Sequence, residues 1–194
     1  IDESLKIVDE ILNRHALGEA LEALNSLVTA APDNPRIIEK LINVYLDQGK
    51  EEEAENLQLR LSEIHENAGR MEEAKEPLND ILSRKPDSTE AYSHLSDIAY
   101  MQGEKEKAKE HLKKIVSIFK EKGDLDNAVA TYDRLINIEP DEVTYKEEQI
   151  ELLLEDDKKD NAFQKCLELV NYLEAKKQNE LLVQKLRFAL ELKP

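Results

Sequence analysis

Apolar residues recur along this chain at the three-and-four spacing of amphipathic helices. Within residues 89–142 the first such face is formed by Tyr92, Leu95, Ile98 and Ala99. Each helical run stops at a residue that ends helices, namely Gly103, Gly123 and Pro140. The spacing therefore predicts helices over residues 89–101, 105–121 and 125–138.

The same pattern recurs along the chain with a 54-residue period. Four prolines keep this period: Pro32, Pro86, Pro140 and Pro194. Two alanine series keep it as well: Ala20, Ala74 and Ala128, and Ala54, Ala108 and Ala162. We infer three full units of three helices, called a, b and c, over residues 35–88, 89–142 and 143–194, preceded by a partial unit 1–34 that holds only b and c. The predicted fold is all-α, with 11 helices in a single solenoid domain over residues 1–194.

The two alanine series and one proline lead to predictions about helix packing. The alanine series lie near the starts of helices b and c, where we expect a neighbouring helix to approach too closely for a larger side chain. Pro77 falls inside helix c of its unit, where it removes a backbone hydrogen bond and should kink the helix.

These residues resemble the tetratricopeptide repeat, a helix-turn-helix motif. Counted from Pro35, the resemblance rests on Ile38, Leu41, Ile42, Tyr45, Gly49 and Ala54. Counted from Thr89, it rests on Tyr92, Leu95, Ser96, Ala99, Gly103 and Ala108. A second register carries the latter half of the motif in Gly69, Ala74, Leu78, Ile81 and Pro86. The resemblance covers the whole chain and implies a right-handed α-solenoid of helical hairpins.

The spacing departs from that of the family. The motif alanines are separated alternately by one full family repeat and by a shorter step, in the order Ala20, Ala54, Ala74, Ala108, Ala128 and Ala162. Helix b is therefore predicted to close one repeat and open the next. The last unit departs further, with Asp157 and Lys177 in place of the glycines and Leu182 in place of an alanine.

Composition and charge narrow the class of protein. The 43 acidic and 27 basic residues give a net charge of −16, and such a surface repels nucleic acids and anionic membranes. No apolar run approaches the roughly 20 residues of a spanning helix. The chain begins at Ile1, which favours a fragment or a processed product. The single Cys166 forms no internal disulfide, which fits the cytoplasm, although a disulfide-free periplasmic protein is indistinguishable on this criterion.

We predict no catalytic residue, cofactor or metal site. No two of the histidines have the four-residue helical spacing of a metal site: His15, His65, His94 and His111. His65 stands one period before the apolar Phe119, so we expect it to be buried or half-buried. Cys166 occupies a position where the family packs an apolar residue, so we expect a small core residue.

The resemblance implies that a partner binds to the concave face, at fixed positions of helix a. The predicted partner-binding residues are Lys40, Asn43, Leu46, Asp47, His94, Asp97, Tyr100, Met101, Glu147, Glu148, Glu151 and Glu155. Tyr100 and Met101 are the predicted anchors, unless they close the end of helix a against a neighbouring helix. The glutamates favour a basic partner, unless they form an ordinary solvated surface. Glu39 and Ser93, where some members carry Lys, argue against a clamp for a C-terminal carboxylate.

The predicted function is that of a non-catalytic scaffold or adaptor that binds a peptide, a helix or the edge of another protein. The partner is expected to be basic or apolar, and neither a nucleic acid nor a membrane. The alternative is a structural module that assembles with itself through the ends of the array, because the chain starts without helix a and stops without a polar capping helix. Light scattering distinguishes the two.

Overall fold

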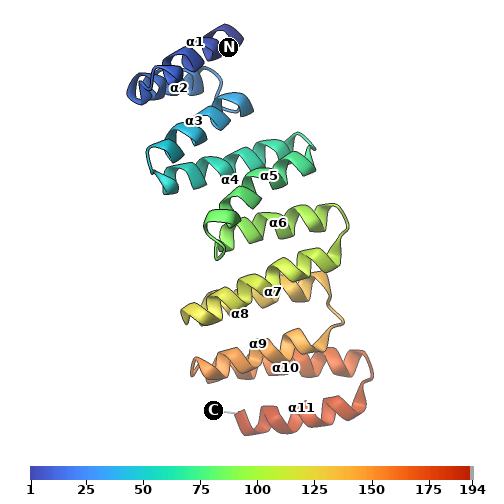
Figure 1. Cartoon of the computed structure of the whole chain (residues 1–194). Coiled ribbons are helices and arrows are strands. Elements are labelled where there is room, and N and C mark those ends of the chain that lie inside the picture. Colours follow the sequence, from blue (N-terminus) through green and yellow to red (C-terminus); the bar gives the residue numbers. More distant parts are fainter. Residues whose placement is uncertain (193–194) are drawn as a thin grey trace. The chain divides into compact units, whose positions relative to one another are not determined.

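The computed structural model describes residues 1–192, and within them it contains eleven α-helices and no strand (Figure 1). The helices are α1 (Asp2–Asn13), α2 (Leu17–Ala30), α3 (Pro35–Asp47), α4 (Glu51–Asn67), α5 (Met71–Arg84), α6 (Thr89–Met101), α7 (Lys105–Lys122), α8 (Leu125–Ile138), α9 (Val143–Glu155), α10 (Lys159–Ala175) and α11 (Asn179–Leu192). The all-α prediction is confirmed, and the helices expected over 89–138 end within one residue of their predicted limits. Pro194, the last proline of the series, lies outside the described residues.

Helix lengths follow the 54-residue period. The a helices α3, α6 and α9 each have 13 residues, and the c helices α2, α5, α8 and α11 each have 14. The b helices α4, α7 and α10 are longer, at 17, 18 and 17 residues. The predicted 11 helices and their order of a, b and c are therefore present in the described chain.

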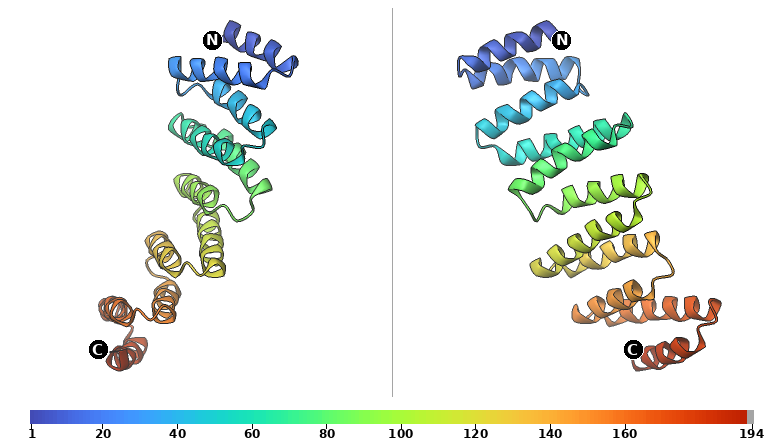
Figure 2. Two further views of the ribbon diagram at one scale, coloured as in Figure 1. Left: turned by 90° about the vertical axis from the view of Figure 1, so that its left-hand side faces the viewer. Right: turned by 45° about the vertical axis from the view of Figure 1, so that its right-hand side comes forward.

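The chain divides into two compact units, residues 1–101 and the residues from Gln102 onward. In the first unit each helix packs on its neighbours in sequence, and α4 also contacts α6. In the second unit the same stacking in chain order runs from α7 to α11 (Figure 2). Helix b thus contacts a helix on both sides, since α4 packs on α3 and α5, and α10 packs on α9 and α11.

The alanine series lie where helices meet. All six motif alanines have 0% of their surface exposed, as the prediction of close helix packing requires. Around them lie separate apolar clusters: one joins α2 with α3 through Leu24, Ile37 and Leu41, and another joins α5 with α6 through Leu78 and Leu95. Within each unit the core therefore consists of interfaces between consecutive helices.

At two repeated turn positions, each directly after a helix, the backbone is left-handed. Gly49 and Gly103 have φ of +69° and +77°, and Asp157 at the same register keeps +53°. At the other register, His15 (+57°) and Lys177 (+58°) adopt the conformation of their glycine counterparts. The sharp turn into the next helix dictates this conformation, so it persists where the sequence has lost the glycine.

We expect Lys177→Gly to raise the free energy of unfolding by about 1 kcal/mol, because it removes the steric cost of a side chain at positive φ. Urea denaturation followed by circular dichroism measures the change. Gln178→Gly is the matched control, since its backbone is not left-handed, and it should be neutral or destabilising. A loss of stability in Lys177→Gly contradicts the assignment of strain to this turn.

Helix a starts in the same way in every unit. Asn34 accepts a hydrogen bond from the backbone N–H of Arg36 at 3.1 Å, and Glu142 accepts one from Thr144 at 3.1 Å. Ser88 accepts one from Ala91 at 3.3 Å. These three caps stand one period apart and satisfy backbone donors that the first turn leaves free. Each helix of type a is thus defined by its N-terminal cap as well as by its apolar face.

Candidate functional site

The predicted groove residues of α3 face in different directions. Lys40 forms an ion pair with Asp9 of α1, and Leu46 packs partly buried against the α3–α4 cluster around Ile42. Asn43 lines a cavity between α3 and α5, whereas Asp47 is exposed. Of the four predicted α3 residues, Asn43 lines this cavity.

The predicted residues of α6 lie outside the two cavities described below. His94 Nδ1 lies 3.4 Å from Glu66 Oε1 of α4, which holds the imidazole against its neighbour. Tyr100 and Met101 are exposed by 50% and 56%, and Asp97 is exposed too. The exposure of Tyr100 and Met101 suits an anchoring role, which stays a prediction.

The four predicted partner-binding glutamates of α9 lie in different environments. Glu147 forms an ion pair with Lys185 of α11 at 2.5 Å. Glu148 lines a second cavity, while Glu151 and Glu155 are exposed. Glu147 and Glu148 therefore have different neighbours, and the four glutamates stay predicted partner-binding residues.

The first cavity, here called the α3–α5 groove, has a volume of about 310 Å³ and lies over α4 in the first unit. Its floor is apolar or buried, and it is made of Ile42, Gln58, Leu61 and Pro77. Its rim is polar and acidic, and it is made of Glu39, Asn43, His65, Glu73, Glu76 and Asp80. The groove is thus amphipathic.

Four rim carboxylates give the α3–α5 groove its charge: Glu39, Glu73, Glu76 and Asp80. All four are exposed, and within the described residues none of them forms an ion pair. Because Pro77 has no N–H, the helical hydrogen bond that would reach the carbonyl of Glu73 is missing beside this rim. The groove therefore presents hydrogen-bond acceptors and negative charge, which complement Lys and Arg.

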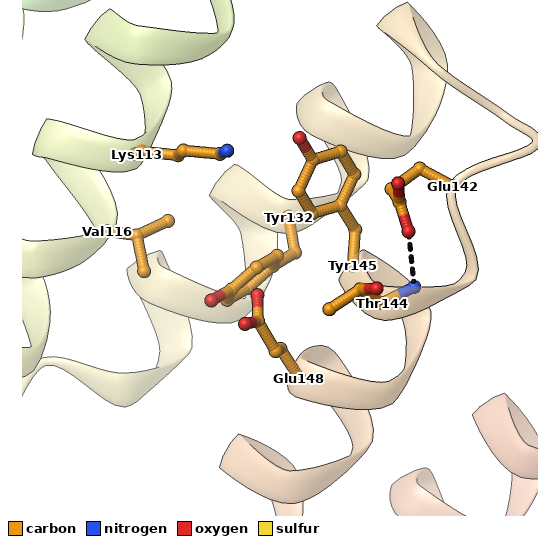
Figure 3. A pocket seen from close by; sticks show the side chains of 7 residues that line it. All are labelled: Lys113, Val116, Tyr132, Glu142, Thr144, Tyr145 and Glu148. Carbon is orange, nitrogen blue, oxygen red and sulfur yellow. Dashed lines mark hydrogen bonds between the residues drawn. The ribbon is translucent and has the colours of Figure 1, made fainter.

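The second cavity, here called the tyrosine cavity, lies among α7, α8 and α9 and has a volume of about 430 Å³ (Figure 3). Tyr132 and Tyr145 flank it, and they are 7% and 6% exposed. The Nζ of Lys113 lies 5.4 Å from the centre of the Tyr145 ring, a cation–π distance. Glu142 and Glu148 place negative charge at the same opening, so the tyrosine cavity has mixed charge.

Two groups of the tyrosine cavity have shifted pKa values. Burial, followed by hydrogen bonding with Glu148, raises the pKa of Tyr132 above its usual range. The hydrogen bonds from Thr144 lower the pKa of Glu142 below its ordinary value. At neutral pH the cavity therefore holds a neutral Tyr132 and a charged Glu142.

Cys166 and His65, which were considered as a nucleophile and a metal ligand, are held by packing and hydrogen bonding. Cys166 is fully buried in the core of α9, α10 and α11, and burial raises the pKa of its thiol, as expected for a small core residue. His65 is half-buried, as predicted, and accepts a hydrogen bond from Arg70 Nε at 3.0 Å. In residues 1–192 no group of three His, Cys, Asp or Glu side chains is placed to hold a metal ion. None of the described helices has both the length and the apolar character needed to cross a membrane.

Most of the residues that line the two cavities lie outside the predicted set, because the predicted residues all belong to helix a. Glu73, Glu76 and Asp80 follow a three-and-four spacing that places them on one face of helix c, and this signal was available. Tyr132 and Tyr145 stand where the preceding unit has Leu78 and Ala91, which was a second signal. Both cavities need helices b and c: α4 and α5 line the first, and α7 and α8 line the second.

Comparison with known families matches three stretches of the chain. A tetratricopeptide repeat model matches residues 55–88 and 90–121, and a second tetratricopeptide repeat model matches residues 115–142. The last two matches overlap at residues 115–121, within α7. No protein of curated function matches the chain.

Solved structures with similar architecture include the MamA MSR-1 C2 structure, at 21% identity with a TM-score of 0.36, covering 61% of this chain and 76% of that one. A tetratricopeptide repeat protein from Parabacteroides merdae is 16% identical with a TM-score of 0.31 and coverages of 100% and 93%. BtubC (BKLC) from P. vanneervenii is 12% identical with a TM-score of 0.48 and coverages of 92% and 89%.

The helical hairpins, their shared alanines and their turn registers define a helical repeat protein. The chain contains tetratricopeptide repeats, matched over residues 55–88, 90–121 and 115–142. Tetratricopeptide repeats serve in general as protein-interaction scaffolds.

Proposed function

We propose that this protein is a non-catalytic adaptor that binds a basic, amphipathic segment of another protein in the α3–α5 groove. The observation that carries the proposal is the pairing of an apolar floor with four rim carboxylates that lack ion-pair partners among the described residues. A segment with Lys or Arg on one side and apolar residues on the other matches both features.

The rim itself favours such a partner. Glu73, Glu76 and Asp80 lie on one face of α5, and their mutual repulsion decreases when a cation binds between them. The buried Ile42 and Leu61 offer apolar contact below this rim, so a bound segment gains from both charge and burial. Charge complementarity chiefly accelerates binding and selects the partner.

The test uses a fluorescein-labelled peptide with Leu at helical spacing and Lys at the other positions, and a matched peptide with Glu in place of Lys. We expect the Lys peptide to bind and the Glu peptide not to bind. The variant Glu73→Gln, Glu76→Gln and Asp80→Asn should weaken binding of the Lys peptide about tenfold, because three exposed charge pairs are lost. Fluorescence anisotropy at several salt concentrations measures the effect.

A matched control separates the groove from the overall charge. Glu51→Gln, Glu52→Gln and Glu53→Gln remove the same number of charges from the first turn of α4, outside the α3–α5 groove. This control should change the affinity less than about twofold. Equal losses in the two triple variants mean that the peptide only senses net charge, and the groove assignment then fails.

Self-association through the ends of the array is a second candidate function. The observation that favours it is the exposure of Ile1 and Ile7 by 54% each at α1, since large apolar side chains in the open favour contacts. Light scattering over a range of protein concentrations tests it. A mass that stays at one chain across that range removes this candidate.

A further inference from the structure

The tyrosine cavity places two aromatic rings and two carboxylates around one opening (Figure 3). Tyr132 comes from α8 and Tyr145 from the first turn of α9, and each ring keeps a small exposed part at the cavity. Glu142 caps the start of α9, and the carboxylate of Glu148 lies at the hydroxyl of Tyr132. The faces of aromatic rings and carboxylates both attract cations, so this arrangement has the chemistry of a cation site.

The two carboxylates of the tyrosine cavity have capacity for a further charged partner. Within the described residues neither Glu142 nor Glu148 forms an ion pair. A carboxylate has about four acceptor sites, and the hydrogen bonds to Thr144 and to Tyr132 leave several of them open. Both glutamates are half-buried, so water screens a charge pair formed there less than it screens an exposed pair. A cation with several donors therefore suits the opening.

A cation of the chain itself already lies at this opening. The Nζ of Lys113 is 5.4 Å from the centre of the Tyr145 ring, and the lysine charge also acts on Glu142. Lys113 is exposed and forms no ion pair within the described residues, so its side chain is held there weakly. A cation that binds more tightly displaces it, and Lys113 marks where the charge of a ligand lies.

The rings of the tyrosine cavity exceed what helix packing needs. One period earlier the two tyrosines are replaced by Leu78 and Ala91, both 0% exposed. Glu148 is replaced there by His94. Aliphatic side chains therefore suffice to pack a c helix on the following a helix, and the second unit carries two rings and a carboxylate in addition to that requirement.

We infer that the tyrosine cavity binds the guanidinium group of an arginine. A guanidinium is planar and stacks on an aromatic ring, and its five N–H groups donate to carboxylates in several directions. An ammonium group lacks the flat face, and a quaternary ammonium lacks the donors. The cavity volume of about 430 Å³ lies in the range of small-ligand pockets. The inference concerns a different cavity from the α3–α5 groove and does not depend on it.

The test is an NMR titration that follows the backbone amide signals of the full chain as N-acetyl-arginine amide is added. Salt at about 0.15 M screens general attraction to the net charge of −16. The matched probe is N-acetyl-citrulline amide, in which a neutral urea replaces the guanidinium. We expect saturable shifts at Thr144 and Glu148 with the arginine compound, and binding at least tenfold weaker with the citrulline compound, because charge-assisted hydrogen bonds are lost.

A second arm identifies the source of the arginine. A short peptide with one arginine between serine and glycine residues is titrated in the same way. Tighter binding of the peptide than of N-acetyl-arginine amide assigns the site to arginine within a polypeptide, because the backbone then adds contacts. Equal binding assigns the site to a free guanidinium compound. Both results place the guanidinium in the tyrosine cavity when the same amide signals shift.

Substitutions around the tyrosine cavity should act in opposite directions. Glu148→Gln should weaken binding of the arginine compound about fivefold, because one carboxylate charge is lost. Lys113→Gln should strengthen it about threefold, because the competing cation leaves the Tyr145 ring. Lys114→Gln is the matched control, since Lys114 is exposed and lies outside the cavity lining, and it should change the affinity less than about 1.5-fold.

The contribution of the ring is tested at Tyr145. Tyr145→Phe keeps the aromatic face and should bind the arginine compound with nearly the same affinity. Tyr145→Leu removes that face and should weaken binding about fivefold. Circular dichroism melting checks that both variants remain folded, and Glu148→Gln and Lys113→Gln decide the matter if the Leu variant does not fold.

The inference is overturned if the arginine and citrulline compounds bind equally, or if Glu148→Gln leaves the affinity unchanged. It is also overturned if Lys113→Gln and Lys114→Gln have equal effects, because net charge alone then governs binding. Shifts confined to the α3–α5 groove overturn it as well. The triple variant of the α3–α5 rim should bind the arginine compound normally, so failure here and failure of the α3–α5 groove are distinguishable.

Discussion

Leu78→Ala is expected to lower the free energy of unfolding by about 2 to 5 kcal/mol. Leu78 is 0% exposed and lies at the centre of the α5–α6 interface, among Ala74, Ile81, Ala91 and Leu95. The substitution removes buried methyl groups and leaves a cavity, because closely packed helices collapse only partly around it. Urea denaturation followed by circular dichroism measures the loss, which should fall on the transition of the first unit.

The repeat provides a matched control for this effect. Leu186→Ala is the same substitution at the same register of helix c, but Leu186 is 42% exposed. We expect it to cost about 1 kcal/mol or less, because solvent already fills the space around much of the side chain. Equal costs at Leu78 and Leu186 contradict the difference in burial between the two positions.

Ala108→Leu is expected to lower the free energy of unfolding by about 1 to 3 kcal/mol. Ala108 is fully buried near the start of α7, and a side chain with three more carbons must displace its neighbours. The effect is the reverse of the Leu78 case: the damage comes from added volume rather than from a cavity. The thermal midpoint and the urea midpoint should both fall.

Ala130→Leu separates volume from helix propensity. Ala130 lies on the exposed side of α8, and Leu is nearly as good a helix former as Ala. The control should change the free energy of unfolding by less than about 0.5 kcal/mol. A neutral Ala108→Leu would mean that helix b is not held at close approach, contrary to the packing reason for the alanine series.

The fold was predictable because each signal along the chain is local. The three-and-four spacing and the breakers Gly103, Gly123 and Pro140 each act within a turn or two of one helix. The repeats strengthened the prediction, because the pattern of residues 89–142 recurs in the other units. The turns at Asp157 and Lys177 kept the glycine conformation, because their neighbours and not their own side chains decide it.

The predicted binding residues were harder to place. Lys40, His94 and Glu147 have the register of groove residues, but each pairs with a side chain of another helix: Asp9, Glu66 and Lys185. Each of those partners lies two helices away along the chain, so no local pattern reveals them. Of the predicted residues, Asn43 lines the α3–α5 groove and Glu148 lines the tyrosine cavity.

The sequence by itself determined the helices, their three-membered units and the apolar face of each, because hydrophobic spacing and turn residues act over short distances. Only the tertiary structure decided that carboxylates of α3 and α5 gather above the buried Ile42 and Leu61, and that Leu186 is open where Leu24, Leu78 and Tyr132 are covered. The physical reason is that burial and charge pairing depend on which helix lies alongside, and a periodic sequence gives similar residues to covered and uncovered faces alike.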